Sequence, residues 1–186
     1  MKAFVLSTVA AAALAIVPLS AAQGAVLTVG GPLAKVCYNH ALAADGRSFA
    51  IDGCTRALNE EALPAPDKAA TYVNRGIVYM SAGRLALADA DFDAALAINA
   101  GLPDGWLNKG FLRLRQGNGR DALPLIQKGI DVGAGRQALA IFARGVAHEQ
   151  MGNYAAAYAD LRQARMLEPG WSMPREYLAS YRVSSR

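Results

Sequence analysis

A short segment recurs three times along this chain of 186 residues, and its spacing constrains the fold more than any other feature. The repeated segments are YVNRG (72–76), WLNKG (106–110) and IFARG (141–145), at offsets of 34 and 35 residues. The same offsets relate four further sets of positions: Gly83, Gly117 and Gly152; Ala88, Ala122 and Ala157; Phe92, Ile126 and Leu161; and Ala95, Gly129 and Ala164. A repeat of this length predicts one supersecondary unit per copy, with the units stacked into a solenoid.

The repeated positions of each copy fall on one stripe of each of two successive helices. In the first copy the leading stripe has the spacing i, i+4, i+7 and i+11, and the second helix carries a facing stripe: Tyr72, Gly76, Tyr79 and Gly83, then Ala88, Phe92 and Ala95. Small residues at Gly76 and Ala88 let the two backbones approach. Gly83 lies where the chain must reverse, a place for a residue with positive φ. The pattern predicts a helical hairpin.

The middle copy departs from this pattern. Arg113 takes the place of Tyr79, Gly129 takes the place of an alanine, and Pro124 enters the second helix. Proline is tolerated in the first helical turn, where the missing N–H has no partner in any case. We therefore expect this helix to begin near Asp121.

These positions make the chain similar to the tetratricopeptide-repeat family, and in particular to its secreted bacterial members. The first copy matches the family pattern closely, and the third copy nearly as well, at Met151, Gly152, Asn153, Tyr154, Ala157, Leu161, Ala164 and Pro169. The resemblance implies an all-α fold: a right-handed α-solenoid of about four helix-turn-helix hairpins with a C-terminal capping helix. It also implies a module that binds other proteins.

We expect the repeat domain to cover residues 33–182. It comprises a degenerate hairpin, three repeats and a capping helix, at residues 33–66, 69–102, 103–137, 138–170 and 171–182. Residues 23–32 are expected to be a flexible N-terminal segment, and residues 183–186 a tail. The helix register of the degenerate hairpin stays open, because aligning Asn39 with Asn74 and aligning Gly46 with Gly83 give different answers.

The first 22 residues have the pattern of a secretory signal peptide. Lys2 precedes a long apolar run, and the small residues at 20–22 favour cleavage after Ala22, with Gly24 or Ala25 as alternative ends. No second apolar run of membrane-spanning length follows. We expect a periplasmic or otherwise secreted protein that does not insert into the membrane after cleavage. The alternative is an uncleaved anchor.

Two cysteines occur in the chain, Cys37 and Cys54. They are equidistant from a turn between Asp45 and Gly46, so in an antiparallel helical hairpin they should face each other. In an oxidising compartment this predicts a disulfide, which contributes about 3 kcal/mol through loop entropy. The alternative is a metal or redox site of Cys37, His40 and Cys54, which has no fourth ligand nearby in the sequence.

Catalytic, cofactor and nucleic-acid functions find little support. The net charge of +4 is small and spread out, without a basic cluster that alternates with aromatic residues. The chain contains no GxSxG, HExxH or CxxC pattern, and its glycine pairs at 117–119 and 133–135 complete no phosphate loop. His148 takes the place of Tyr79 and is interpreted as a packing residue. We expect no enzymatic activity, no cofactor and no metal site.

In a solenoid of this kind the leading helices line a concave groove that can take a peptide. Six apolar residues recur there as i, i+4 pairs: Val73 and Ile77, Leu107 and Phe111, Phe142 and Val146. Asn74 and Asn108 flank them, and an amide can both donate to and accept from a peptide backbone. The alternative is that neighbouring helices bury these side chains and that the asparagines bond within the solenoid. Phe111 and Phe142 are the residues for which we favour the groove.

The sequence therefore predicts a periplasmic protein–protein interaction module that binds an apolar peptide or protein segment in a concave groove. A structural subunit of an envelope assembly, held by a permanent partner or by self-association, is the first alternative. A Cys/His metal or redox protein is the second. The repeat pattern specifies no oligomeric state.

Overall fold

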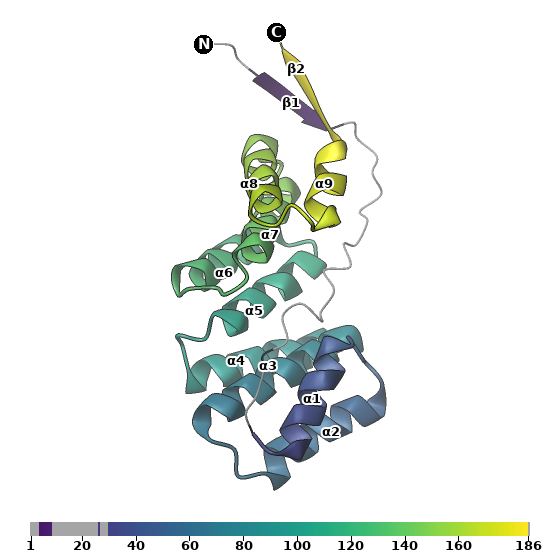
Figure 1. Cartoon of the computed structure of the whole chain (residues 1–186), viewed down its shortest axis with the longest axis vertical. Helices are drawn as coiled ribbons and strands as arrows, with labels where there is room; N and C mark the ends of the chain where they lie inside the picture. The colour runs from purple at the N-terminus through teal and green to yellow at the C-terminus, as the bar shows by residue number, and fades with distance from the viewer. Residues whose placement is uncertain (1–3, 9–25, 27–29, 186) are drawn as a thin grey trace.

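In the computed structural model, residues 4–8, 26 and 30–185 are described. Nine helices occur in this part of the chain: α1 (Pro32–Leu42), α2 (Ser48–Glu60), α3 (Ala65–Ser81), α4 (Leu85–Ile98), α5 (Pro103–Arg115), α6 (Gly119–Asp131), α7 (Gln137–Gln150), α8 (Tyr154–Leu167) and α9 (Ser172–Ala179). Two short strands, β1 (Phe4–Thr8) and β2 (Tyr181–Ser185), pair antiparallel beside the helical stack (Figure 1). The predicted cleavage point after Ala22 lies outside the described residues.

The helices form a stack of antiparallel hairpins, which confirms the all-α fold (Figure 1). Each helix packs against the helix that follows it in sequence, and the leading helices also contact one another in the pairs α1–α3, α3–α5 and α5–α7. No helix of the described residues is both long enough and apolar enough to cross a bilayer. The stack is the frame that positions the repeated side chains.

Close backbone approach within each hairpin explains the repeated glycines. A Cβ atom on Gly76 would lie 2.4 Å from the Phe92 ring, and one on Gly110 would lie 2.5 Å from Ile126 Cγ1. At the hairpin turn, Gly83 has φ +74°, as the sequence predicted. The side chains that meet across the two helices are buried in two apolar clusters, one formed by α1 to α4 with Leu112 and the other by α5 to α8 with Tyr181.

The second helix of the middle hairpin begins earlier than expected. α6 starts at Gly119 rather than near Asp121, because Asn118 caps it: the Asn118 Oδ1 accepts a hydrogen bond from the Asp121 N–H at 3.1 Å. Pro124 therefore lies in the second turn of the helix. The residue is exposed, so water can satisfy the carbonyl that lacks a helical N–H partner.

The two ends of the stack are closed by different means. At the N-terminal end, the Glu61 carboxylate accepts hydrogen bonds from the backbone N–H groups of Leu33 (2.8 Å) and Ala34 (2.9 Å), which lie in the first turn of α1. At the C-terminal end α9 packs against α8. This helix ends at Ala179 and not at residue 182, and β2 takes up the residues that were expected to form its last turn and the tail.

Candidate functional site

The eight residues predicted to line a peptide groove come together on the leading helices, but they are not an open surface. Their exposed fractions lie between 0 and 5% for Val73, Asn74, Ile77, Leu107, Asn108, Phe111, Phe142 and Val146. An exposed apolar strip, expected from the sequence, is therefore absent from this face. What covers these side chains differs along the stack.

Asn74, on α3, holds the main chain of the N-terminal segment. Its side-chain Oδ1 accepts a hydrogen bond from the Val26 N–H at 2.8 Å, and its Nδ2 donates one to the Val26 carbonyl oxygen at 2.7 Å. The Val26 side chain is partly buried against the apolar cluster that includes Val73 and Ile77. Residue 26, expected in a flexible segment, thus lies against the face where a bound peptide was predicted. Asn108, the equivalent residue on α5, donates to the Asp104 carbonyl at 2.8 Å.

Phe142, at the other end of the predicted strip, packs against α9. Its ring centroid lies 5.0 Å from the rings of both Trp171 and Tyr177, and its side chain is fully buried. The sequence analysis favoured Phe142 as a groove residue and did not predict its contact with Trp171 and Tyr177. The sequence does not indicate on which face of α7 the capping helix packs. Trp171, the residue before α9, and Tyr177 on α9 supply the missing partner.

The middle pair of the strip belongs to the core of its own hairpin. Leu107 Cδ2 lies 2.8 Å from the position that a Cβ atom on Gly129 would occupy, so the glycine that departs from the repeat pattern makes room for this leucine. Phe111 is buried in the same cluster. Leu107 and Phe111 are therefore buried inside the helical stack in this structure.

The two cysteines form the predicted disulfide. Cys37 on α1 and Cys54 on α2 are bonded to each other and fully buried. His40 Nδ1 lies 3.2 Å from Asp45 Oδ2, and its ring meets Phe49 edge-on. With both sulfur atoms in the disulfide, the metal or redox site of Cys37, His40 and Cys54 has no thiolate to offer, and this alternative is wrong for the oxidised protein.

A row of ion pairs lies on the other face of the leading helices, and the sequence analysis missed it. Arg75 donates two hydrogen bonds to the Asp91 carboxylate, both 2.8 Å long, and a third to Thr55 Oγ1 at 3.2 Å. Asp91 is 5% exposed. The signal was present in the sequence, because a second arginine–aspartate pair with the same separation of 16 residues, Arg144 and Asp160, occurs in the third repeat.

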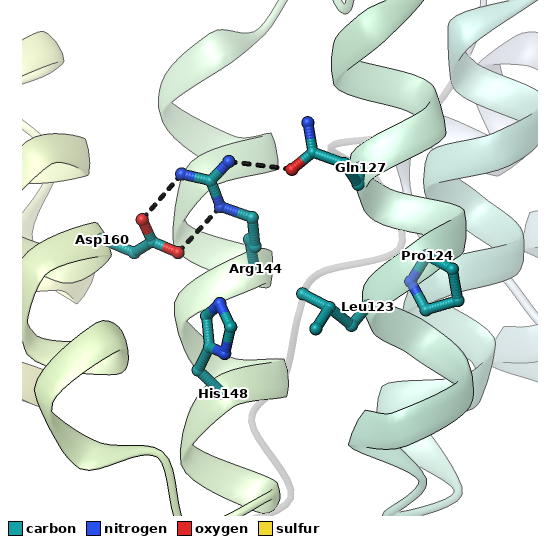
Figure 2. A pocket seen from close by; sticks show the side chains of 6 residues that line it. All are labelled: Leu123, Pro124, Gln127, Arg144, His148 and Asp160. Carbon is teal, nitrogen blue, oxygen red and sulfur yellow. Dashed lines mark hydrogen bonds and ion pairs between the residues drawn. The ribbon is translucent and has the colours of Figure 1, made fainter.

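Arg144 makes the same contacts as Arg75. It donates to Asp160 at 2.9 and 2.7 Å and to Gln127 at 2.9 Å, so its guanidinium joins α8 to α6 (Figure 2). Pairing with Asp160 raises the pKa of Arg144 further above its ordinary value. In the middle repeat, Leu125 takes the place of the aspartate, and Lys109 turns to Asp93 of the preceding hairpin.

A hollow of about 420 Å³ lies on this face between α6, α7 and α8 (Figure 2). It is lined by Leu123, Pro124, Gln127, Arg144, His148 and Asp160. The His148 Nδ1 atom is buried and has no hydrogen-bond partner in the described part of the chain. The interpretation of His148 as a packing residue did not anticipate this hollow. Within the described ranges, no group of three or more His, Cys, Asp or Glu residues is placed to hold a metal ion.

The comparisons with known proteins agree with this geometry. The sequence profile of the tetratricopeptide repeat matches residues 69–101 and 138–170. A comparison with curated protein sequences returns no match.

Solved structures share the fold at low sequence identity. The tetratricopeptide-repeat domain of Arabidopsis OM64 has 19% identity and a TM-score of 0.58, over 62% of this chain and 95% of that one. The first such domain of human RPAP3 has 18% identity and a TM-score of 0.58, over 61% of this chain and 89% of that one. MamA from Desulfovibrio magneticus RS-1 has 20% identity and a TM-score of 0.62, over 80% of this chain and 82% of that one. Two segments of the chain therefore match the tetratricopeptide repeat, and the helical stack has the fold of solved tetratricopeptide-repeat domains.

Proposed function

We propose that the protein is a periplasmic interaction module, in which Asn74 on α3 binds the main chain of an extended, apolar segment of a partner protein. One observation carries the proposal: the Asn74 amide both accepts from and donates to the main chain of Val26. Tetratricopeptide-repeat domains are typically protein–protein interaction modules, which supports the same conclusion. No catalytic family matches the chain, and the family is usually non-catalytic.

The geometry at Asn74 suits an extended peptide whose side chains can vary. Both hydrogen bonds go to one residue's N–H and C=O, as they do between paired β-strands, so they select conformation and not side-chain type. The apolar preference comes from the cluster beneath, which includes Val73 and Ile77 and partly buries the Val26 side chain. A partner segment would take the place of residue 26.

This proposal narrows the groove predicted from the sequence. Four residues of that groove are buried in the apolar core of the stack: Leu107, Phe111, Phe142 and Val146. Their own contact with a partner stays a prediction, as does that of Asn108. The binding position proposed is the one at Val73, Asn74 and Ile77.

The compartment is part of the proposal. The leader pattern of residues 1–22 favours export, and a buried disulfide between Cys37 and Cys54 is expected to persist in an oxidising compartment. Cleavage after Ala22 would also remove β1, which leaves the helical stack as the exported protein.

Two substitutions with opposite expected effects test the binding position. Val26→Pro removes the N–H that donates to Asn74, so it should loosen the chain's own segment and increase partner capture from an envelope extract. Asn74→Leu keeps the branched side-chain shape and the number of heavy atoms but removes both hydrogen bonds, so it should decrease capture. Partners are identified after amine cross-linking, and the linked residue should be Lys35 or Lys68, which lie on α1 and α3.

Asn99→Leu is the matched control, because Asn99 is an exposed asparagine outside this face. Circular dichroism must show unchanged helicity in all three variants. Equal capture by Val26→Pro, Asn74→Leu and the parent protein would rule out the proposed position. Recovery of only a second copy of this chain would favour the self-associating structural subunit.

A further inference from the structure

We propose that the hollow between α6, α7 and α8 is a second interaction site, which takes an aromatic side chain of a partner protein, with tyrosine preferred. The site lies on α7 away from the concave face. Residues two apart on a helix are separated by about 200°, so Arg144 points away from both Phe142 and Val146. The proposal is thus independent of the function proposed for Asn74.

The first repeat shows which group fits beside such an arginine. The guanidinium carbon of Arg75 lies 5.6 Å from the ring centroid of Tyr79 and 5.6 Å from that of Tyr72. Tyr79 is one helical turn beyond Arg75 and packs against the core. The chain's own tyrosine therefore occupies the space next to the ion pair, where a cation–π contact stabilises it.

In the third repeat the ion pairs are the same but the aromatic rings are absent. His148 stands in the place of Tyr79, and Ile141 stands in the place of Tyr72. Arg144 keeps its bonds to Asp160 and Gln127, as Arg75 keeps those to Asp91 and Thr55. The imidazole is smaller than a phenol ring, and the hollow of about 420 Å³ lies at this place.

The middle repeat fills the same place in another way. Arg113 is the residue equivalent to His148, and it reaches the Asp89 carboxylate at 2.7 Å. Leu123 on α6 is the residue equivalent to Asp89 one repeat later, so α6 contributes no carboxylate to the lining of the hollow at His148. The equivalent residues in the three repeats are Tyr79, Arg113 and His148. Tyr79 supplies a large ring and Arg113 an ion pair, whereas among the described residues His148 supplies neither.

The lining of the hollow selects a neutral ring. Leu123 and Pro124 offer apolar surface, and the charges of Arg144 and Asp160 already neutralise each other (Figure 2). An aromatic ring can stack on a paired guanidinium, as Tyr79 does on Arg75. The Nδ1 atom of His148 is closed to solvent, whereas the other ring nitrogen points toward Arg144 (Figure 2) and can accept from or donate to a phenol hydroxyl according to the tautomer. A tyrosine therefore satisfies more of the site than a phenylalanine.

Binding of N-acetyl-tyrosinamide to the purified protein tests the proposal. Nuclear magnetic resonance follows the side-chain amide of Gln127 and the Nε–H of Arg144, which both line the hollow. We expect saturable shifts of both signals, and weaker binding of N-acetyl-phenylalaninamide. His148→Tyr restores the residue type of the first repeat and fills the hollow, so it should weaken binding at least about tenfold, which corresponds to the loss of about 1.4 kcal/mol.

Met166→Tyr is the matched control, because it adds the same ring at a residue that is 66% exposed and lies elsewhere on α8. It should leave the affinity unchanged. Absence of saturable shifts in the parent protein would overturn the proposal, and so would equal affinity in His148→Tyr. If His148→Tyr does not keep its helicity, Tyr79→His decides: a new saturable shift at the Arg75 Nε–H supports the site, and none contradicts it.

Discussion

At the scale of single residues, polar side chains at repeated positions join one hairpin to the next. Arg115 donates to the Met80 carbonyl at 2.8 Å, and Gln150 donates to the Leu114 carbonyl at 2.9 Å. These two hydrogen bonds are equivalent, one repeat apart. Each carbonyl lies in the last turn of the preceding leading helix and also accepts from the N–H of the turn glycine, Gly83 at 3.0 Å and Gly117 at 2.9 Å. The side chains thus add a second hydrogen bond to carbonyls that the turn already caps, and this bond comes from the next hairpin.

Removing the carboxylate that faces Arg75 should destabilise the protein strongly. Asp91→Ala leaves a guanidinium that is 16% exposed without its partner, which costs about 3 kcal/mol of unfolding free energy. Glu60→Ala is the matched control, because the Arg56–Glu60 pair is 51% exposed on both sides and water replaces the lost contact. Urea unfolding measures both variants. Similar effects of the two substitutions would contradict the structural role assigned to Asp91.

The carboxyl group of Glu149 should make stability depend on pH. Burial raises the pKa of Glu149 above its ordinary value of 4.5, and the nearby Tyr181 offsets only part of this effect. The folded state therefore binds the proton more tightly than the unfolded state, so stability falls as the pH rises from 4.5 through the raised pKa. Glu149→Gln should remove this loss and be more stable than the parent protein at pH 7.

Urea unfolding at pH 4 and pH 7 checks this expectation. Glu176→Gln, at an exposed position on α9, removes the same charge from the surface and is the matched control. Equal pH dependence in Glu149→Gln and the parent protein would show that the Glu149 carboxyl is hydrated in the folded state.

At the scale of elements, the closeness of the paired helices depends on what faces each glycine. A Cβ atom on Gly76 would lie 2.4 Å from the Phe92 ring, whereas the nearest atom to one on Gly145 would be 3.2 Å away. Phe92 is fully buried, and close-packed protein interiors leave little room for a ring to move. The α3–α4 hairpin is therefore packed more tightly at this point than the α7–α8 hairpin.

Alanine substitution of these two glycines should have unequal effects. Gly76→Ala forces the Phe92 ring to move and should destabilise the protein by about 1–3 kcal/mol through overpacking. Gly145→Ala requires a shift of a few tenths of an ångström, and its gain in helix propensity offsets part of that strain. Thermal unfolding by circular dichroism compares the two variants. A Gly145→Ala variant less stable than Gly76→Ala would contradict this packing argument.

At the scale of the whole molecule, α9 covers an aromatic residue that the last hairpin would otherwise leave uncovered. Phe142 meets Trp171 and Tyr177 of the capping segment, each at a ring-centroid distance of 5.0 Å. A solenoid needs such a cover, because its terminal unit has no neighbour on one side. Phe142 therefore serves the end of the stack.

Truncating this side chain should lower stability without affecting a groove. Phe142→Ala is expected to cost about 3–5 kcal/mol, which lowers Tm by on the order of 10 °C in a chain of this size. Phe49→Ala, at a residue that is 51% exposed, should have a small effect. Scanning calorimetry measures both. For the same reason, loss of partner capture in Phe142→Asp would report unfolding and not a ligand contact.

The periodicity of the sequence by itself determined the helical hairpins, their order and the pairing of Cys37 with Cys54. These features depend on spacing along one or two helices, and spacing can be read directly from the residues. Only the tertiary structure decided which repeated side chains are available to a partner. Asn74 meets Val26, which lies 48 residues away, and Phe142 is covered by α9. Burial depends on contacts between segments distant in sequence, and a repeat pattern contains no information about what folds over it.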